Sequence, residues 1–335
     1  MRKLKDSTLV TSVRNEGPFL LEWIAWYRML GFQNILVVHN DCTDHSPQLL
    51  RLLERHGVLV QKSNTPNPDS PPQPQNHAAA GKHRLVRHAS WVFVADVDEF
   101  LVVHTGDRSI SALAEAIGGK GIGMAINWRV FGSGGATEWR DTFVHRRFTR
   151  AGEVTARQNS CFKTFFRDPG SFGKLRAHGP AGWRGKRWGV DDRLFLLADG
   201  APYESYHPSR NPQNATTRDR MTNTLAQVNH YAVQSREQFT YKQGRPSAAM
   251  LEDRYTEDFF QRFDRNETIN EDALAYDDAF FAAHQKLADI PGVKRLHHLC
   301  CADYVAAMCR KRGDDPAADA RYLMHMQKAD ALPRH

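Results

Sequence analysis

Residues 91–100 read WVFVADVDEF, an apolar run of five residues followed by three carboxylates within four positions. A run of this kind is typical of a strand buried on both faces, as in a parallel sheet. Ligands of such sheets bind beyond the carboxyl ends of the strands, where Asp96 and Asp98 would lie. Two carboxylates that project to one side suit Mg²⁺ or Mn²⁺, whereas the alternative is a plain acidic turn.

Strand and helix patterns alternate in the residues before this stretch. Short β-prone runs predict strands at 8–13, 35–38 and 58–60. The first helix is expected to be capped by Asn15 and to end at Gly31, and the second to run from Ser46 to about Arg55. Strands separated by helices of this length indicate βαβ units and a mainly parallel sheet.

The alternation of strand and helix patterns is less regular in the segments on either side of residue 100. Residues 63–75 hold five prolines and predict a loop, either a binding loop or a surface excursion. Asn76 is expected to cap a helix that reaches about His88. Further along, the sequence predicts a helix at 110–117, β-prone segments at 122–130, 142–148 and 161–166, and helical patches from Tyr255 onward.

The composition is that of a soluble globular protein. The chain has 335 residues, of which 41% are hydrophobic and 25% charged, and this excludes disordered, collagenous and coiled-coil proteins. No apolar run approaches the roughly 20 residues that span a bilayer, so a cytoplasmic location is expected. Five irregularly spaced cysteines suit reduced thiols better than disulfides.

Positive charge is concentrated in one segment. The net charge is +7, and residues 140–190 hold 12 Lys/Arg against 3 acidic residues. Such a segment attracts phosphates, an acidic substrate or anionic lipid at the inner face of a membrane, although a solvated basic surface is the alternative. Nucleic-acid binding is not expected, because no recognition motif accompanies the charge.

Two more polar segments follow predicted strands. Arg14, Asn15 and Glu16 come after the first strand, where a helix N-terminus can cradle a nucleotide. Simple capping by Asn15 is the alternative. Asp41 follows the second strand, where it can accept hydrogen bonds from a ribose or base, or form an Asx turn.

Several short motifs extend these three sites. They are VRNE at 13–16, EW at 22–23, GF at 31–32, NDCTD at 40–44, DVDEFL at 96–101, FGSG at 131–134, NHY at 229–231, and Ser235, Phe239 and Lys242. Together they resemble GT-A glycosyltransferases of the family 2 type, close to the subgroup that also resembles family 92. The resemblance runs from about residue 8 to about residue 276. It implies an α/β, Rossmann-like fold whose mainly parallel sheet is flanked by helices. Residues 1–245 would form the catalytic domain and 246–335 a helical C-terminal extension.

The resemblance also implies a chemistry. A nucleotide-sugar donor, UDP-linked as first choice, would bind with Mn²⁺ or Mg²⁺ and pass its sugar to a hydroxyl of a saccharide or glycoconjugate acceptor. Asp98 would be the main metal ligand, and Asp96 would lie near the donor ribose and the metal. Glu16 and Asp41, beside Arg14 and Asn15, would contact the nucleoside. His230 would complete the metal shell or touch the diphosphate, unless it is a core histidine.

The catalytic base is less well defined. An inverting transfer needs a carboxylate to take the acceptor proton, and Glu138 and Asp141 are candidates because they follow the glycine-rich turn. For each, a salt bridge with a neighbouring arginine is the alternative. A sugar nucleotidyltransferase is a competing function, disfavoured because no glycine-rich basic loop follows the first strand. A non-catalytic module that binds nucleotide sugars or polysaccharides is the third hypothesis.

One cluster near the C-terminus resembles a zinc site at first sight. It consists of His297, His298, Cys300 and Cys301. Ligands this crowded in sequence rarely match tetrahedral spacing, and the segment has a helical pattern. The sequence therefore predicts a structural role for these residues.

Overall fold

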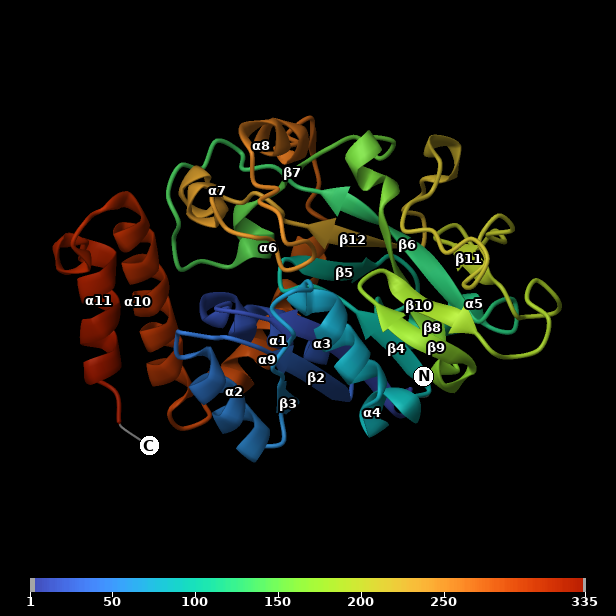
Figure 1. Ribbon diagram of the computed structural model, residues 1–335, viewed down its shortest axis with the longest axis horizontal. Coiled ribbons are helices and arrows are strands. Elements are labelled where there is room, and N and C mark those ends of the chain that lie inside the picture. Colours follow the sequence, from blue (N-terminus) through green and yellow to red (C-terminus); the bar gives the residue numbers. More distant parts are fainter. Residues whose placement is uncertain (1–3, 334–335) are drawn as a thin grey trace.

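A large sheet forms the centre of the computed structural model, which describes residues 4–333 (Figure 1). Its nine strands follow the order β3-β2-β1-β4-β8-β6-β12-β5, with β11 beside β6. The strands are β1 (Ser7–Val13), β2 (Asn34–His39), β3 (Val60–Ser63), β4 (Trp91–Val94), β5 (Glu99–Val103), β6 (Gly123–Val130), β8 (Phe162–Arg167), β11 (Phe195–Leu197) and β12 (Ala226–His230). Five pairings, β1 with β2 and β4, β2 with β3, and β6 with β11 and β12, are parallel. The predicted α/β class with a mainly parallel sheet is confirmed.

Helices and two small sheets surround this sheet. The helices are α1 (Gly17–Leu30), α2 (Ser46–Arg55), α3 (Pro72–Gly81), α4 (Arg84–Arg87), α5 (Ile110–Ile117), α6 (Val144–Arg147), α7 (Arg236–Lys242), α8 (Glu257–Phe263), α9 (Asp277–Ala288), α10 (Val293–Arg312) and α11 (Ala320–Asp330). The two-stranded sheets pair β9 (Phe172–Arg176) with β10 (Gly179–Trp183), and β7 (Arg150–Ala151) with β13 (Thr268–Ile269).

The central strands are buried on both faces, as their apolar runs predict. Leu9 and Phe93 belong to the core under α1, α2, α5 and α9. Their neighbours Val10, Val92 and Val94 belong to the opposite core, which α3, α4 and residues 162–206 cover. Because side chains alternate along a strand, one continuous apolar run supplies both cores.

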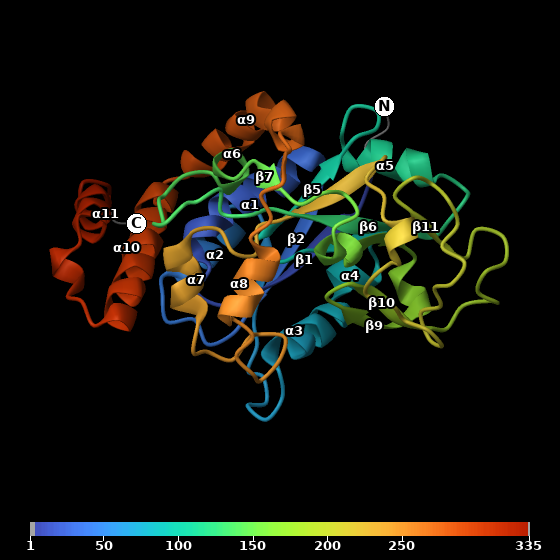
Figure 2. The ribbon, with the colours of Figure 1, turned by 90° about the horizontal axis from the view of Figure 1, so that it is seen from above.

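The C-terminal helices lie along one side and one end of the molecule. Figure 2 shows α10 and α11 side by side at that end, and α10 also packs against α1 and α2. Residues 246–333 are therefore mainly helical, as expected. The boundary between 245 and 246 remains a prediction, and residues 1–3 and 334–335 of the predicted ranges lie outside the described residues.

The structure corrects several predicted elements. The helix expected from Asn76 begins at Pro72 and ends at Gly81, because proline fits the first turn of a helix. Residues 142–148 contain the short helix α6 in place of a strand. Asn15 does not cap α1: its φ is 57°, and the N-cap position belongs to Glu16. Ser46 is the first residue of α2, so the N-cap position belongs to His45, and the Asp44 carboxylate accepts the Ser46 N–H.

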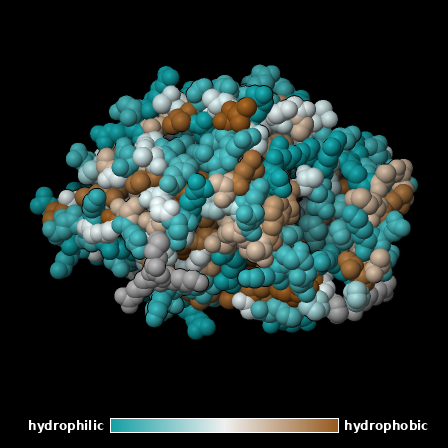
Figure 3. Space-filling model, turned by 180° about the vertical axis from the view of Figure 1, so that it is seen from behind, coloured by the Kyte–Doolittle hydropathy of each residue, from teal (hydrophilic) through white to brown (hydrophobic). Residues whose placement is uncertain are grey.

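The described part of the chain has no membrane-spanning helix, and one face of its surface is largely polar (Figure 3). None of the helices within residues 4–333 is long and apolar enough to cross a bilayer. The face seen from behind is mostly hydrophilic, with hydrophobic residues in small separate groups (Figure 3).

Candidate functional site

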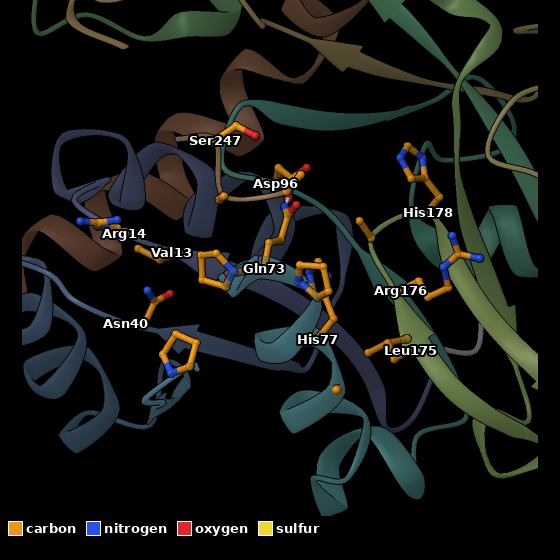
Figure 4. Close-up of a pocket in the computed structure, with 18 of the residues that line it drawn as sticks. Val13, Arg14, Asn40, Gln73, His77, Asp96, Leu175, Arg176, His178 and Ser247 are labelled. Atoms are coloured by element: carbon orange, nitrogen blue, oxygen red, sulfur yellow. Dashed lines mark hydrogen bonds between the residues drawn. The ribbon is translucent and has the colours of Figure 1, made fainter. Parts of the chain in front are cut away.

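A cleft of about 2080 Å³ opens beyond the carboxyl ends of β1, β2 and β4. Its floor is formed by residues 12–16, 40–43 and 96–98. Helix α3, the β9–β10 hairpin and residues 241–255 form its walls. Figure 4 shows Gln73 and His77 of α3 beside Asp96, with Arg176 and His178 across the cavity. Three loops that are far apart in sequence therefore meet at one edge of the sheet.

Most of the predicted site residues come together here. Seven of them line the cleft: Arg14, Asn15, Glu16, Asp41, Asp96, Asp98 and His230. The predicted bases Glu138 and Asp141 do not line it. Glu138 is exposed, and its backbone carbonyl accepts a hydrogen bond from Arg147. Asp141 Oδ1 lies 3.1 Å from Nε2 of His297 on α10. Their position after the glycine-rich turn does not bring these two acids to the cleft, because the loop that holds them continues toward His297 on α10.

Asp96 is held from both sides at the end of β4. Its Oδ1 accepts a hydrogen bond of 2.7 Å from Gln73, and its Oδ2 lies 3.1 Å from Nζ of Lys163. The same ammonium lies 2.8 Å from Oε2 of Glu99, which also accepts the Asp96 N–H. Burial raises the pKa of Asp96, but the charge and hydrogen bond of Lys163, together with His77 and His178, outweigh burial and lower that pKa to about 2. Asp96 is therefore ionised, with both oxygens already engaged by protein groups.

Asp98 faces His230 and Lys242 across the floor of the cleft. Its Oδ1 lies 3.9 Å from Nε2 of His230, and its Oδ2 lies 4.0 Å from Nζ of Lys242. Burial lowers the pKa of His230 to about 4, although Asp98 opposes this, so the ring is neutral at pH 7. A neutral imidazole is the form that binds metals.

The Asp98–His230 pair fits a divalent cation. Their separation of 3.9 Å lies between the roughly 2.9 and 4.1 Å that separate adjacent and opposite ligands of an octahedral ion with bonds of about 2.0–2.1 Å. In the described part of the chain, a third protein ligand does not lie close enough to this pair. Among residues 4–333, no group of three His, Cys, Asp or Glu side chains with ligand atoms within 4.8 Å of one another includes Asp96, Asp98 or His230. The protein would thus supply two ligands to the cation. Water and substrate phosphates usually complete the coordination shell of Mg²⁺ and similar ions.

The turns after β1 and β2 are tied to each other. Asn15 Nδ2 donates to Thr43 Oγ1, and the Thr43 N–H donates to Asn15 Oδ1. Asn40 Nδ2 donates to the Asp41 carboxylate, and both Asn15 and Asp41 adopt positive φ. Burial raises the pKa of Glu16 to about 8, although Lys242 opposes it. These polar groups form a preorganised edge that can hydrogen-bond a ribose or a base.

The cleft carries an excess of positive charge. Its lining includes eleven Lys/Arg side chains and four Asp/Glu side chains, so basic side chains outnumber acidic ones by seven. Lys174, Arg176 and Arg184 come from the predicted basic segment, whereas Lys242, Arg245 and Arg254 come from α7 and the following loop. Such a lining concentrates anionic ligands. The basic composition of 140–190 signalled the first three cations.

Other cleft residues had no recognisable signal in the sequence. Gln73 lies in the proline-rich stretch that predicts only a loop, and Lys163, which is buried beneath the cleft, is one of twelve basic residues in its segment. His77 and His178 line the cleft; His77 is buried and His178 half-buried, and desolvation lowers the pKa of each to about 4. Their positions depend on how α3 and the β9–β10 hairpin pack over the sheet.

Comparison with known proteins places these observations in a family. The family model of glycosyltransferase family 92 matches residues 11–250. No curated protein matches the chain in sequence. Among solved structures, residues 1–349 of TarS from S. aureus share 12% identity, with 97% of this chain and 91% of that chain covered and a TM-score of 0.35. The complex of that protein with UDP-GlcNAc gives 11%, the same coverage and a TM-score of 0.34. A putative glucose-1-phosphate thymidylyltransferase from Bacillus anthracis shares 8% identity with this chain. The match covers 52% of this chain and 68% of that chain, with a TM-score of 0.27. At such TM-scores these structures carry no argument about this chain.

Proposed function

This chain belongs to glycosyltransferase family 92, and on that premise we propose that it transfers a sugar from a nucleotide-sugar donor to an acceptor hydroxyl. The observation that carries the proposal is the pair formed by Asp98 and His230, whose facing atoms lie 3.9 Å apart at the edge where the β1 and β2 turns also end. A diphosphate bound there would have a nucleoside-binding edge on one side and cationic side chains on the other.

Each part of the donor has a suitable counterpart in the cleft. We assign Arg14, Asn15, Glu16 and Asp41 to the nucleoside, with UDP as first choice. Lys242, whose Nζ lies 4.0 Å from Asp98, would neutralise charge on the diphosphate. Asp96 would orient the ribose through a carboxylate that Gln73 and Lys163 hold in place.

Asp98 and His230 would hold Mn²⁺ or Mg²⁺. When bound, the cation would supply Lewis-acid stabilisation of the leaving diphosphate. The fixed position of the His230 ring, packed 4.1 Å from the Trp128 ring between centroids, keeps Nε2 directed at Asp98. This packing reduces the reorganisation needed when the donor binds.

Hydrolysis of UDP-sugars with and without Mn²⁺ tests the proposal. Asp98→Ala should lower metal-dependent turnover by at least about 100-fold, because loss of residues that only orient metal ligands already costs about 10–100-fold. Asp219→Ala, at a side chain that is 78% exposed, is the control and should leave turnover unchanged. Full activity in Asp98→Ala would contradict the assignment. Pyrophosphate release from a nucleoside triphosphate and a sugar phosphate would favour a nucleotidyltransferase.

We further propose that the transfer inverts the anomeric centre and that the acceptor is acidic. The excess of seven basic over acidic side chains in the cleft is larger than one diphosphate neutralises, which supports an anionic acceptor. The anomeric configuration of the product, read by NMR, decides the stereochemistry, and retention would contradict inversion. An acceptor KM that does not change with salt concentration would rule out an acidic acceptor.

A further inference from the structure

A second group of potential metal ligands lies outside the cleft, where α10, α11 and residues 138–143 meet. It consists of Asp141, His297, His298, Cys301 and His325. None of these residues lines the cleft described above. Cys301 and His325 are buried, while the side chains of His297 and Asp141 are 17% and 28% exposed. The cluster therefore has a buried side and a side open to solvent.

The ligand atoms of the cluster form two overlapping sets. Asp141 Oδ1 lies 3.1 Å from His297 Nε2, and Cys301 Sγ lies 3.6 Å from the same nitrogen. His298 Nδ1 and His325 Nδ1 lie 3.2 Å apart. The donor atoms of Asp141, His297 and His298 lie within 4.8 Å of one another, as do those of Asp141, Cys301 and His325. Asp141 is common to both sets.

We propose that this cluster binds a Zn²⁺ ion that fastens α11 to the rest of the protein. Thiolate, imidazole and carboxylate ligands together select zinc over Mg²⁺ or Ca²⁺, which prefer oxygen. Zinc–ligand bonds of about 2.0–2.3 Å place tetrahedral ligands about 3.3–3.8 Å apart. Asp141 Oδ1 and Cys301 Sγ lie 3.1 and 3.6 Å from His297 Nε2, close to that range, so a small adjustment of these ligands suffices.

Hydrogen bonding within the protein leaves these rings incompletely satisfied. His325 Nε2 is buried without a hydrogen-bond partner among the described residues, and it is a nitrogen through which His325 can bind the ion. The short contact between His298 and His325 joins two ring nitrogens, which bond only if one donates and the other accepts. Unpaired buried polar atoms are rare, and a bound ion is one recognised explanation for them.

The position of the cluster gives the ion a mechanical role. Helix α11 packs mainly against α10, to which residues 313–319 connect it. Zinc bound by Asp141, α10 and His325 would tie three segments that are distant in sequence. The ion would bind with release of the Cys301 thiol proton to solvent, because the thiolate is the metal ligand.

The proposal differs from the expectation that ligands crowded in sequence do not form a zinc site here. His297 and Cys301 are four residues apart, so α10 presents both on one face. The predicted partner Cys300 lies on another side of the helix, where Gly17 of α1 and Ser46 of α2 approach each other closely. The missing ligands, Asp141 and His325, come from segments that only the tertiary structure brings to α10.

Zinc binding by the purified full chain tests the proposal directly. After treatment with a chelator, the chain is dialysed against Zn²⁺ alone, and bound metal is counted by mass spectrometry. We expect one zinc per chain and a raised melting temperature, because a ligand that binds only the folded state stabilises it. Co²⁺ should give a thiolate charge-transfer band in the near ultraviolet, a readout that does not depend on enzymatic activity.

Matched variants separate this site from other thiols and from the cleft. Cys301→Ala should lose the charge-transfer band and weaken zinc binding by at least about 10-fold, as should His297→Gln, whose ring is partly exposed. Cys309→Ala, a buried cysteine two turns further along α10, should keep both, and so should Asp98→Ala. Absence of bound zinc in the folded wild-type chain would overturn the proposal. So would full binding by His297→Gln, or loss of binding in Asp98→Ala.

Discussion

Lys163→Met is expected to destabilise the protein strongly, because Lys163 neutralises two carboxylates under the cleft. The lysine side chain is 1% exposed, and its Nζ lies 2.8 Å from Glu99 Oε2 and 3.1 Å from Asp96 Oδ2. Glu99 is fully buried, and the Asp96 side chain is 29% exposed. Methionine keeps most of the apolar stem but removes the charge, so the pKa of Asp96 should rise.

The magnitude follows from the burial of this group. Removal of one partner from a buried ion pair costs about 3–5 kcal/mol, because the remaining charge is left without compensation. An exposed ion pair contributes only about 0–1 kcal/mol. Lys163 contacts two acids from a position that excludes solvent, so the loss belongs in the first range.

Urea unfolding followed by tryptophan fluorescence measures this loss. Lys294→Met removes a lysine that is 51% exposed and lies 3.4 Å from Asp289, and it should leave the unfolding midpoint unchanged. Adding Glu99→Gln to Lys163→Met should recover part of the stability, because the neutral amide needs no counter-charge. A loss below about 1 kcal/mol for Lys163→Met would refute the view that the triad is buried and charged. The absence of any recovery in the double variant would refute the role given to Glu99.

Two further predictions concern stability. Glu22→Ala should lower the free energy of unfolding by about 3–5 kcal/mol, because Glu22 is buried and accepts the N–H groups of Val144 and His145 and contacts the His145 ring at 2.7 Å. Urea unfolding measures this, and a loss below about 1 kcal/mol would contradict it. In the metal-free chain, burial lowers the pKa of five histidines to about 4, namely His77, His178, His230, His298 and His325, and raises that of Glu16 to about 8. Below about pH 6.5 the unfolded chain therefore binds more protons, and stability should fall as the pH is lowered; between about pH 6.5 and 8 Glu16 reverses the slope. Melting temperatures from pH 5 to 8 should show a maximum near pH 6.5, and a steady rise to pH 8 would contradict this.

Local patterns predicted the parts of the site that strand ends position. The apolar run at 91–95 predicted a doubly buried strand, and β4 with Asp96 and Asp98 at its end agrees with that reading. Arg14, Asn15, Glu16 and Asp41 reach the same edge, because parallel strands place their carboxyl ends together. His230 was found only through its resemblance to a family motif.

Patterns failed where a residue's role depended on a distant partner. Glu138 and Asp141 follow the glycine-rich turn in sequence, but their loop runs toward α10 and away from the cleft. Gln73 and Lys163 carry no local signal, since one lies in a proline-rich segment and the other among many basic residues. Their contacts with Asp96 exist because α3 and β8 approach the end of β4 from opposite sides.

The sequence alone determined the α/β class, the parallel strands and the acids at their ends. These features depend on hydrophobic periodicity and on neighbours along the chain, which are visible in a single sequence. The tertiary structure alone decided that Lys163 neutralises Asp96 and Glu99, and that Asp141 joins His297, Cys301 and His325. The contact between Asp141 and His325, which are 184 positions apart, is set by the packing of whole elements, which no local pattern encodes.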